Sequence, residues 1–355
     1  MKIIVTGSLG YIGSVLTDYL SRGGFDVIGW DTGFFKDCLL YSPAPIKTIF
    51  KDVRDMDASD LDGIEAVVHL AGISNDPFGD LEAAKVYDPT RDYSLRLAKI
   101  CKKVGSRFIF ASSCSVYGQG GNAMLTEDSP VNPQTPYSLN KVQIEDDLRS
   151  LSDKDFSPIA LRLATVFGLS PRMRFDVVIN MLVGMALTSG KLVLNSDGTP
   201  WRPNIYILDA LKAIRFALAS DYNQGKLLIL NVGADENNLQ VIEIAGRIQN
   251  QVPGCELKFL AQSPELDERG LVGDRKVRGG VDTRDYRVSF SKIKRYFKGF
   301  SCDWSVDRGI QQMLAELKKL ALTNEQFKNI NFYRLQKMDE LYKNGYLGKD
   351  LRWLK

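Results

Sequence analysis

The sequence predicts an α/β protein built on a doubly wound parallel sheet, and three observations indicate this fold. Short apolar runs rich in β-branched residues alternate with longer segments of helical periodicity through the first half of the chain. The first run, 2–6, leads directly into the glycine pattern Gly7-x-x-Gly10-x-x-Gly13, and a helical pattern follows. Small and polar residues stand at the ends of several runs, where parallel sheets bind ligands.

We expect six strands in this sheet, with helices between them. The strands are predicted at 2–6, 25–30, 46–50, 66–70, 107–111 and 157–163, and the helices at 11–22, 81–103 and 137–151. Pro89 is expected to interrupt the second helix and reset its start. Farther along, helices are predicted at 176–189, 209–219, 241–250 and 305–322, a strand at 191–194 and a loop at 196–203.

The periodic pattern loosens after the sixth strand, which predicts a division of the chain. Residues 1–169 are expected to form a dinucleotide-binding domain, and 170–323 a smaller substrate lobe whose pieces interleave with it. Residues 324–355, charged with recurring Leu, Tyr and Trp, are expected to form a helical tail. This tail is predicted to pack on the body of the protein or on a second subunit.

The glycine-rich turn between the first strand and helix is suited to a pyrophosphate. Gly7 permits a tight turn, Gly10 allows a ligand to approach the backbone, and Gly13 lets the helix lie against the strand. The helix directs unpaired N–H groups and the positive end of its dipole at the turn. A structural turn without a ligand is the alternative, and the position between strand and helix favours a dinucleotide site.

Three more strand ends are expected to hold the rest of the dinucleotide. Asp31 follows the glycines at close to the spacing of about 20 residues at which a carboxylate binds the adenosine ribose. A carboxylate there repels a 2′-phosphate, which favours NAD over NADP, although Lys36 nearby leaves NADP open. Asp52-Val53 is expected to bracket the adenine. Ala71-Gly72 is small enough for phosphates and ribose to pass close to the backbone.

Tyr137 and Lys141 are candidates for acid–base chemistry. They stand one helical turn apart, so a phenol and an ammonium project from the same helix face. A phenol with a reference pKa of about 10 is a poor base at neutral pH, and a neighbouring ammonium favours its ionised form. Ser113, at the mouth of the preceding strand, is expected to contact the same substrate hydroxyl. An ordinary solvated pair is the alternative.

Composition and charge restrict the class of protein. A net charge of +3 without long runs of one sign gives no indication of a nucleic-acid or anionic-membrane partner. No long apolar span occurs, and we expect no signal peptide. The five cysteines are scattered, and the single histidine, His69, lies in a predicted strand and is expected to be a core residue. We therefore expect a reduced, cytoplasmic enzyme without a metal.

The motifs together resemble the extended short-chain dehydrogenase/reductase superfamily, in its NAD-dependent nucleotide-sugar epimerase/dehydratase branch. They are TGSLGYIG, Asp31, HLAG, SSCSVYG, PYSLNK and DGTPWRPNIYILD, and the resemblance covers about residues 1–293. It implies a Rossmann-type fold, a homodimer formed through the predicted helices 81–103 and 137–151, and a catalytic triad of Ser113, Tyr137 and Lys141. The NAD contacts that it implies are Gly7, Gly10, Tyr11, Ile12, Gly13, Asp31, Asp52, Val53, Leu70, Ala71, Gly72, Tyr137 and Lys141.

The resemblance also implies a nucleoside diphosphate-sugar bound between the two lobes. Asn180 and Arg202 match positions that relatives use near the diphosphate. Arg284 and Arg278 are candidates for a further arginine of the family pattern, which stands later in the chain. The guanidinium fork suits a diphosphate because it is always charged and binds two oxygens at once. The substrate contacts that it implies are Ser74, Ser113, Thr165, Asn180, Arg202 and Arg284.

Departures from the family pattern narrow the reaction. Sugar-nucleotide 4,6-dehydratases carry an Asp-Glu pair after the catalytic hydroxyl residue, where this chain has Cys114 and Ser115, so this reaction is not expected. A 3,5-epimerase relative uses a cysteine at the position of Ser115, so Cys114 is expected to be a buried thiol rather than an acid or base. Thr90 and Thr165 stand where galactose 4-epimerases have asparagines, and Ser74 where they have a lysine, which leaves the sugar open.

We expect a nucleotide-sugar epimerase that acts at C4 by transient oxidation to a keto sugar, with Tyr137 as base and NAD as cofactor. A net oxidoreductase on the same substrate class, either a 4-dehydrogenase or a keto-sugar reductase, is the second hypothesis and requires a cofactor that leaves. A non-catalytic NAD(H)-binding regulator is the third, and the retained Ser113, Tyr137 and Lys141 argue against it.

Overall fold

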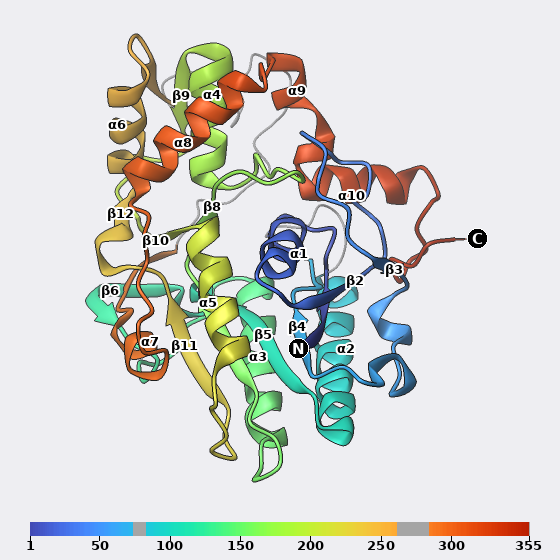
Figure 1. Cartoon of the computed structure of the whole chain (residues 1–355). Helices are drawn as coiled ribbons and strands as arrows, with labels where there is room; N and C mark the ends of the chain where they lie inside the picture. The colour runs from blue at the N-terminus through green and yellow to red at the C-terminus, as the bar shows by residue number, and fades with distance from the viewer. Residues whose placement is uncertain (74–82, 261–283, 355) are drawn as a thin grey trace.

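The computed structural model describes residues 1–73, 83–260 and 284–354 (Figure 1). At its centre lies a seven-stranded parallel sheet with the strand order β11-β7-β5-β4-β1-β2-β3. The sheet order reverses at β1, so the ligand crevice of such a sheet is expected at the carboxyl ends of β1 and its neighbours. The strands are β1 (Lys2–Thr6), β2 (Asp26–Asp31), β3 (Thr48–Phe50), β4 (Ala66–His69), β5 (Arg107–Ser113), β7 (Ile159–Leu163) and β11 (Leu228–Val232).

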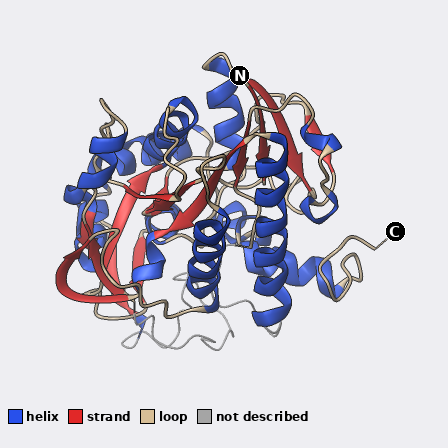
Figure 2. Ribbon diagram, turned by 90° about the horizontal axis from the view of Figure 1, so that it is seen from below, coloured by secondary structure: helices blue, strands red, loops and turns tan. Residues whose placement is uncertain are grey.

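Helices cover both faces of this sheet (Figure 2), which explains why its inner strands are apolar without alternation. Ile3 and Val5 of β1 pack with α1 (Gly13–Arg22) and α5 (Ile207–Ala219) in one core cluster. Ile4, between them, packs on the other face with α2 (Ala83–Val104) and α3 (Pro136–Leu151). The predicted doubly wound α/β fold is confirmed.

Smaller sheets and further helices continue from the carboxyl ends of the main strands. Three small sheets have the orders β12-β10-β8, β13-β9 and β14-β6. Their strands are β6 (Gln119–Leu125), β8 (Thr165–Phe167), β9 (Lys191–Leu194), β10 (Trp201–Tyr206), β12 (Asn238–Gln240), β13 (Glu256–Phe259) and β14 (Asp285–Val288). The helices of this part are α4 (Val178–Ser189), α6 (Val241–Gln251), α7 (Ser291–Tyr296) and α8 (Val306–Lys319).

Three expectations about the elements were wrong. The predicted loop at 196–203 ends in β10, whose Trp201–Pro203 portion pairs antiparallel with β12. Strand β11 was not expected, yet it completes the main sheet beside β7 and is buried along its whole length. Helix α2 runs without interruption through Pro89, which lies inside it.

The C-terminal tail returns to the first half of the chain. It contains α9 (Asn324–Lys328) and α10 (Arg334–Lys343), and Figure 1 shows its end beside β2 and β3. Met338, Leu341, Leu347 and Leu351 form a small apolar cluster, against which the loop after β2 packs at 34–35. Within the described ranges, no helix is both long and apolar enough to cross a membrane.

Candidate active site

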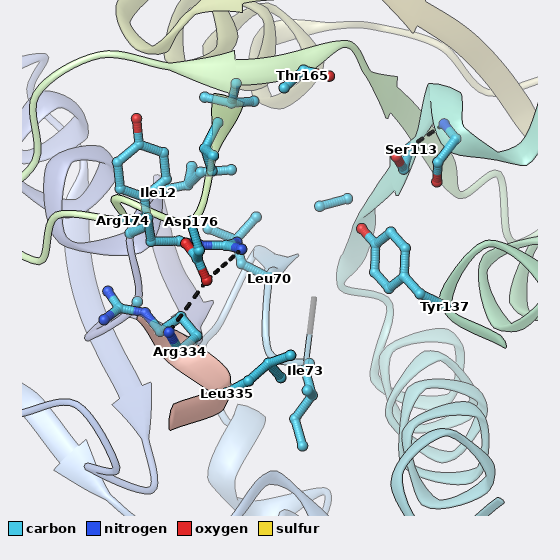
Figure 3. Close-up of a pocket in the computed structure, with 18 of the residues that line it drawn as sticks. Ile12, Leu70, Ile73, Ser113, Tyr137, Thr165, Arg174, Asp176, Arg334 and Leu335 are labelled. Carbon is cyan, nitrogen blue, oxygen red and sulfur yellow. Dashed lines mark hydrogen bonds and ion pairs between the residues drawn. The ribbon is translucent and has the colours of Figure 1, made fainter. Parts of the chain in front are cut away.

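The carboxyl ends of the parallel strands open onto one cavity of about 1180 Å³ (Figure 3). Most of the residues singled out from the sequence line it together, although they come from segments far apart along the chain. They are Gly7, Gly10, Tyr11, Ile12, Gly13, Asp31, Asp52, Val53, Leu70, Ala71, Gly72, Ser113, Tyr137, Lys141, Thr165, Arg202 and Arg284. Ser74 and Arg278, also predicted, lie outside the described residues.

The glycine-rich turn has the geometry that a bound pyrophosphate requires. Gly7 has a φ of +71°, and a Cβ there would lie 2.8 Å from the backbone nitrogen of Ala71. A Cβ on Gly13 would lie 2.1 Å from the carbonyl oxygen of Gly7. Ile12, at the start of α1, makes no side-chain cap. The backbone N–H groups at this helix end therefore face no capping side chain, as an anion site requires.

Asp31 joins the glycine-rich turn to the end of β2. Its Oδ2 accepts a hydrogen bond from the Leu9 N–H at 2.9 Å, and its Oδ1 accepts one from the Gly33 N–H at 2.7 Å. Burial raises the pKa of this carboxyl, and the two N–H groups oppose the rise. Each oxygen retains a second lone pair that a ribose hydroxyl can use. Lys36, which left NADP open, is not among the residues that line this cavity.

Asp52 lies at the end of β3 and binds its neighbour Arg54. Its carboxylate caps the short helix Val53–Asp55 by accepting from the Arg54 N–H at 2.8 Å. The Arg54 guanidinium returns to the same carboxylate, with Nη2 2.6 Å from Oδ2. The sequence analysis did not single out Arg54. Its position two residues after Asp52, with only Val53 between the two opposite charges, is the signal that could have indicated it.

A capping box fixes Tyr137 and Lys141 at the start of α3. The Thr135 hydroxyl accepts from the Ser138 N–H at 3.2 Å, and the Ser138 hydroxyl accepts from the Thr135 N–H at 3.1 Å. Pro136 occupies the first helical position, where its missing N–H is not needed. The first turn of α3 is thereby held at the cavity, and Figure 3 shows the Tyr137 hydroxyl on the side where Ser113 lies.

Lys141 is a buried ammonium beside the phenol. Its Nζ donates to the Ala111 carbonyl oxygen at 2.8 Å and lies 5.5 Å from the centroid of the Tyr137 ring. Burial lowers the pKa of Lys141 to about 8, although Glu145 opposes this shift. Ser113 accepts a hydrogen bond from the Ser115 N–H at 3.1 Å, which leaves its hydroxyl proton for another acceptor.

A buried ion pair holds helix α3 against the sheet close to Ser113 and Lys141. Glu145, on α3, lies 2.6 Å from Arg162, on β7, and both side chains are less than 5% exposed. Glu145 also accepts from the Ser112 hydroxyl at 2.5 Å, next to Ser113. Burial lowers the pKa of Arg162, but its hydrogen bond and ion pair with Glu145 more than offset this and raise the pKa above its ordinary value. Helix α3 is thereby tied to two strands of the sheet.

The structure places Asn180 outside the cavity lining. Its side chain is fully buried, with Oδ1 accepting from the Gly168 N–H at 3.0 Å. Its Nδ2 donates to the Tyr11 hydroxyl at 3.1 Å and to the Arg174 carbonyl oxygen at 2.9 Å. The amide thus connects the turn after β8 to the start of α1.

Two residues expected in the interior are buried as predicted. His69 lies between the Thr6 hydroxyl, at 2.8 Å, and the Ser94 hydroxyl, at 2.9 Å, and burial lowers its pKa to about 3. Cys114 donates to the Arg162 carbonyl oxygen at 3.2 Å, and burial raises its thiol pKa. Cys114 is not among the residues that line the cavity, whereas Ser115 is.

Charged residues that the sequence did not reveal also line the cavity (Figure 3). Arg174 and Asp176 form an ion pair at 2.9 Å, and the Arg334 backbone N–H donates to Asp176 at 3.2 Å. Arg202 donates from Nη1 to the Arg284 carbonyl oxygen, which places the two predicted arginines side by side. Among the described residues, no group of three or more His, Cys, Asp or Glu could hold a metal ion.

Comparison with known proteins agrees with this arrangement. A model of the NAD-dependent epimerase/dehydratase family matches residues 3–233. A UDP-glucose 4-epimerase of Bacillus subtilis is 29% identical over 379 residues, covering 94% of this chain and 99% of the relative.

Solved structures share the fold. A UDP-glucuronic acid 4-epimerase of Bacillus cereus, in complex with UDP-glucuronic acid and NAD, has a TM-score of 0.71 at 24% identity, covering 90% of this chain and 100% of that one. An NAD-dependent NDP-hexosamine 5,6-dehydratase of tunicamycin biosynthesis has a TM-score of 0.74 at 22% identity, covering 90% and 98%.

The family and the geometry agree on the cofactor. The glycine cradle, the half-buried Asp31 and the small residues after β4 fit a dinucleotide, and NAD is the cofactor of this family. The chain belongs to the NAD-dependent epimerase/dehydratase family, as an NAD-dependent nucleotide-sugar enzyme of the extended short-chain dehydrogenase/reductase type.

Proposed function

We propose that this protein is a nucleotide-sugar epimerase that inverts a hydroxyl-bearing carbon of the sugar, at C4. One observation carries the proposal. The Tyr137 phenol, the Lys141 ammonium and Ser113 line the same cavity as the dinucleotide cradle, so the acid–base groups and the cofactor share one space. The similarity to UDP-glucose 4-epimerases supports the choice of carbon.

Tyr137 is the base that removes the proton of the C4 hydroxyl. The Lys141 ammonium, 5.5 Å from the phenol ring, favours the ionised form of a neighbouring phenol and stays charged at neutral pH because its pKa is about 8. Ser113 donates a hydrogen bond from its hydroxyl to the same substrate oxygen and thereby orients the C4 hydroxyl. Bound NAD⁺ would supply the hydride acceptor that makes C4 a carbonyl, and the hydride would return to the other face of C4 after the keto sugar has turned in the cavity. Tyr137 then returns the proton to the inverted hydroxyl.

Arg202 and Arg284 are proposed to hold the substrate's diphosphate. Both line the cavity, Arg202 on β10 and Arg284 directly before β14, and Arg202 is only 9% exposed. Buried guanidinium groups bind phosphate oxygens strongly because water competes little with them. Thr165, on β8, lines the same cavity and is proposed to contact the sugar.

A substrate panel tests the proposal. The enzyme with NAD⁺ is incubated with UDP-, GDP-, CDP- and dTDP-sugars, while NADH absorbance and product NMR are recorded together. A new C4 stereoisomer without accumulating NADH is the expected result. Stoichiometric NADH with a keto sugar would instead establish the net oxidoreductase, and bound NAD⁺ that no sugar nucleotide reduces would support the non-catalytic regulator. We also propose a homodimer through α2 and α3, which light scattering tests directly.

A further inference from the structure

The C-terminal tail forms part of the wall of the cofactor cavity. From residue 333 onward the chain crosses to the carboxyl ends of β2 and β3, where Asp31, Asp52 and Val53 line the cavity (Figure 1). These three residues stand where the adenosine half of a dinucleotide binds. The tail residues that line the same cavity are Tyr333, Arg334, Leu335, Gln336, Met338, Asp350 and Leu351.

Arg54 connects the tail to the predicted adenine site. Its Nη1 donates to the Asp350 carbonyl oxygen at 2.7 Å and its Nη2 to the Leu351 carbonyl oxygen at 3.4 Å. The same guanidinium pairs with Asp52 at 2.6 Å. Leu351 is 6% exposed and has a φ of +58°, a conformation that costs a non-glycine residue about 1–2 kcal/mol. The contacts around Leu351 hold the tail in this conformation.

Two further anchors lie outside the cavity lining. The Trp353 indole N–H donates to the Thr32 carbonyl oxygen at 2.6 Å, and its ring lies 5.4 Å from the Phe34 ring. Arg352 forms an ion pair with Asp55 at 2.6 Å. Thr32 follows Asp31 directly, and Asp55 ends the short helix that Asp52 caps. The anchors therefore fix the two loops that carry the adenosine contacts.

The beginning of the tail contributes buried polar groups. The Arg334 guanidinium lies 4.4 Å from the centroid of the Phe35 ring and donates from Nη2 to the Arg172 carbonyl oxygen at 2.7 Å. The Oε1 atom of Gln336, on the cavity wall, is buried and has no hydrogen-bond partner in the described part of the chain. A buried acceptor of this kind costs about 1–3 kcal/mol of stability.

We propose that the tail is the outer wall of the adenosine half of the NAD site, and that its anchors slow the release of the cofactor. The same NAD molecule then serves successive turnovers. This inference rests on NAD binding and not on the identity of the sugar, yet it bears on the proposed epimerase, because an epimerase regenerates its cofactor within each cycle. It assigns to residues 333–354 a role in cofactor retention.

The rate of cofactor release tests the proposal without any sugar substrate. Protein loaded with radiolabelled NAD⁺ is mixed with excess unlabelled NAD⁺, and the label that remains bound is followed by rapid filtration. The test variant is Arg352→Ala/Trp353→Ala, which removes both anchors and leaves every cavity-lining side chain in place. The matched control is Lys343→Ala, which removes an exposed ion pair with Asp339 inside α10. Circular dichroism of each protein reports its helix content.

We expect the double variant to release NAD⁺ about tenfold faster than the wild type, since changes at an interface act mainly on the dissociation rate. Its affinity for ADP-ribose falls in parallel, whereas its affinity for a UDP-sugar stays that of the control. Release rates equal to those of the Lys343→Ala protein overturn the proposal. An equal loss of ADP-ribose and UDP-sugar affinity also overturns it, because the tail then supports the whole fold and not the adenosine site.

Discussion

Removing one partner of the buried pair Glu145–Arg162 is predicted to destabilise the protein strongly, because the other charge is then left buried and unpaired. In Arg162→Met, the Glu145 carboxylate loses three hydrogen bonds, of 2.6, 3.0 and 3.3 Å, and among the described residues its side chain keeps only the one from the Ser112 hydroxyl. A carboxylate left this deeply buried costs about 3–5 kcal/mol. Replacing both residues, as Glu145→Leu/Arg162→Met, removes the unpaired charge and is expected to restore most of that loss.

Urea unfolding, followed by tryptophan fluorescence, measures these free energies. The matched control is Arg149→Met, on the same helix, which breaks an exposed pair with Asp146 and is expected to cost about 0–1 kcal/mol. Since Glu145 stands one turn beyond Lys141, Arg162→Met is also expected to lower kcat more than it raises KM. An Arg162→Met protein as stable as the Arg149→Met protein would refute the reasoning.

Three further predictions concern the site and its core. Tyr137→Phe is expected to lower turnover by about 10²- to 10⁴-fold with unchanged NAD⁺ binding, and undiminished turnover would remove the phenol from the mechanism. Gly13→Ala places a Cβ 2.1 Å from the Gly7 carbonyl oxygen. The resulting strain of about 1–3 kcal/mol is expected to weaken NAD⁺ binding roughly 10- to 100-fold, as measured by calorimetry. Binding equal to that of the wild type would contradict the role of this turn in holding the pyrophosphate. His69 has a pKa of about 3 in the folded protein and a reference pKa of 6.5, so it binds a proton when the protein unfolds below pH 6.5. The contribution of neutral His69 to the free energy of unfolding is therefore present above pH 6.5 and lost as the pH falls. Between pH 7 and 5 the loss is about 2 kcal/mol, and His69→Gln should show a flatter pH profile in urea unfolding; an equal slope would count against it.

The parts of the site that depend on local spacing were predictable from the sequence. The glycine pattern and the pair Tyr137–Lys141 are read from neighbours along the chain, because one turn and one helix face determine their geometry. The seventh strand, β11, was missed because a short apolar run without alternation does not distinguish a buried strand from part of a helix.

The rest of the site depends on contacts between distant segments. Arg54 and Asp350 are 296 positions apart, and no local pattern indicates that a surface-like tail with charged residues lines a cofactor cavity. Asn180 matched a family position, yet its amide is satisfied within the core by Gly168, Tyr11 and Arg174. Both cases were decided by tertiary packing, which sequence periodicity does not encode.

The most direct test of the account follows one hydrogen atom. The nucleotide sugar that the panel identifies as substrate, labelled with deuterium at C4, is converted in ordinary water with excess unlabelled NAD⁺. The account predicts that the epimerised product keeps deuterium at C4, because the label leaves and returns on a cofactor that stays bound. Loss of deuterium to water or to the free NAD pool would contradict it, since the first result indicates simple deprotonation and the second a cofactor that exchanges in every cycle.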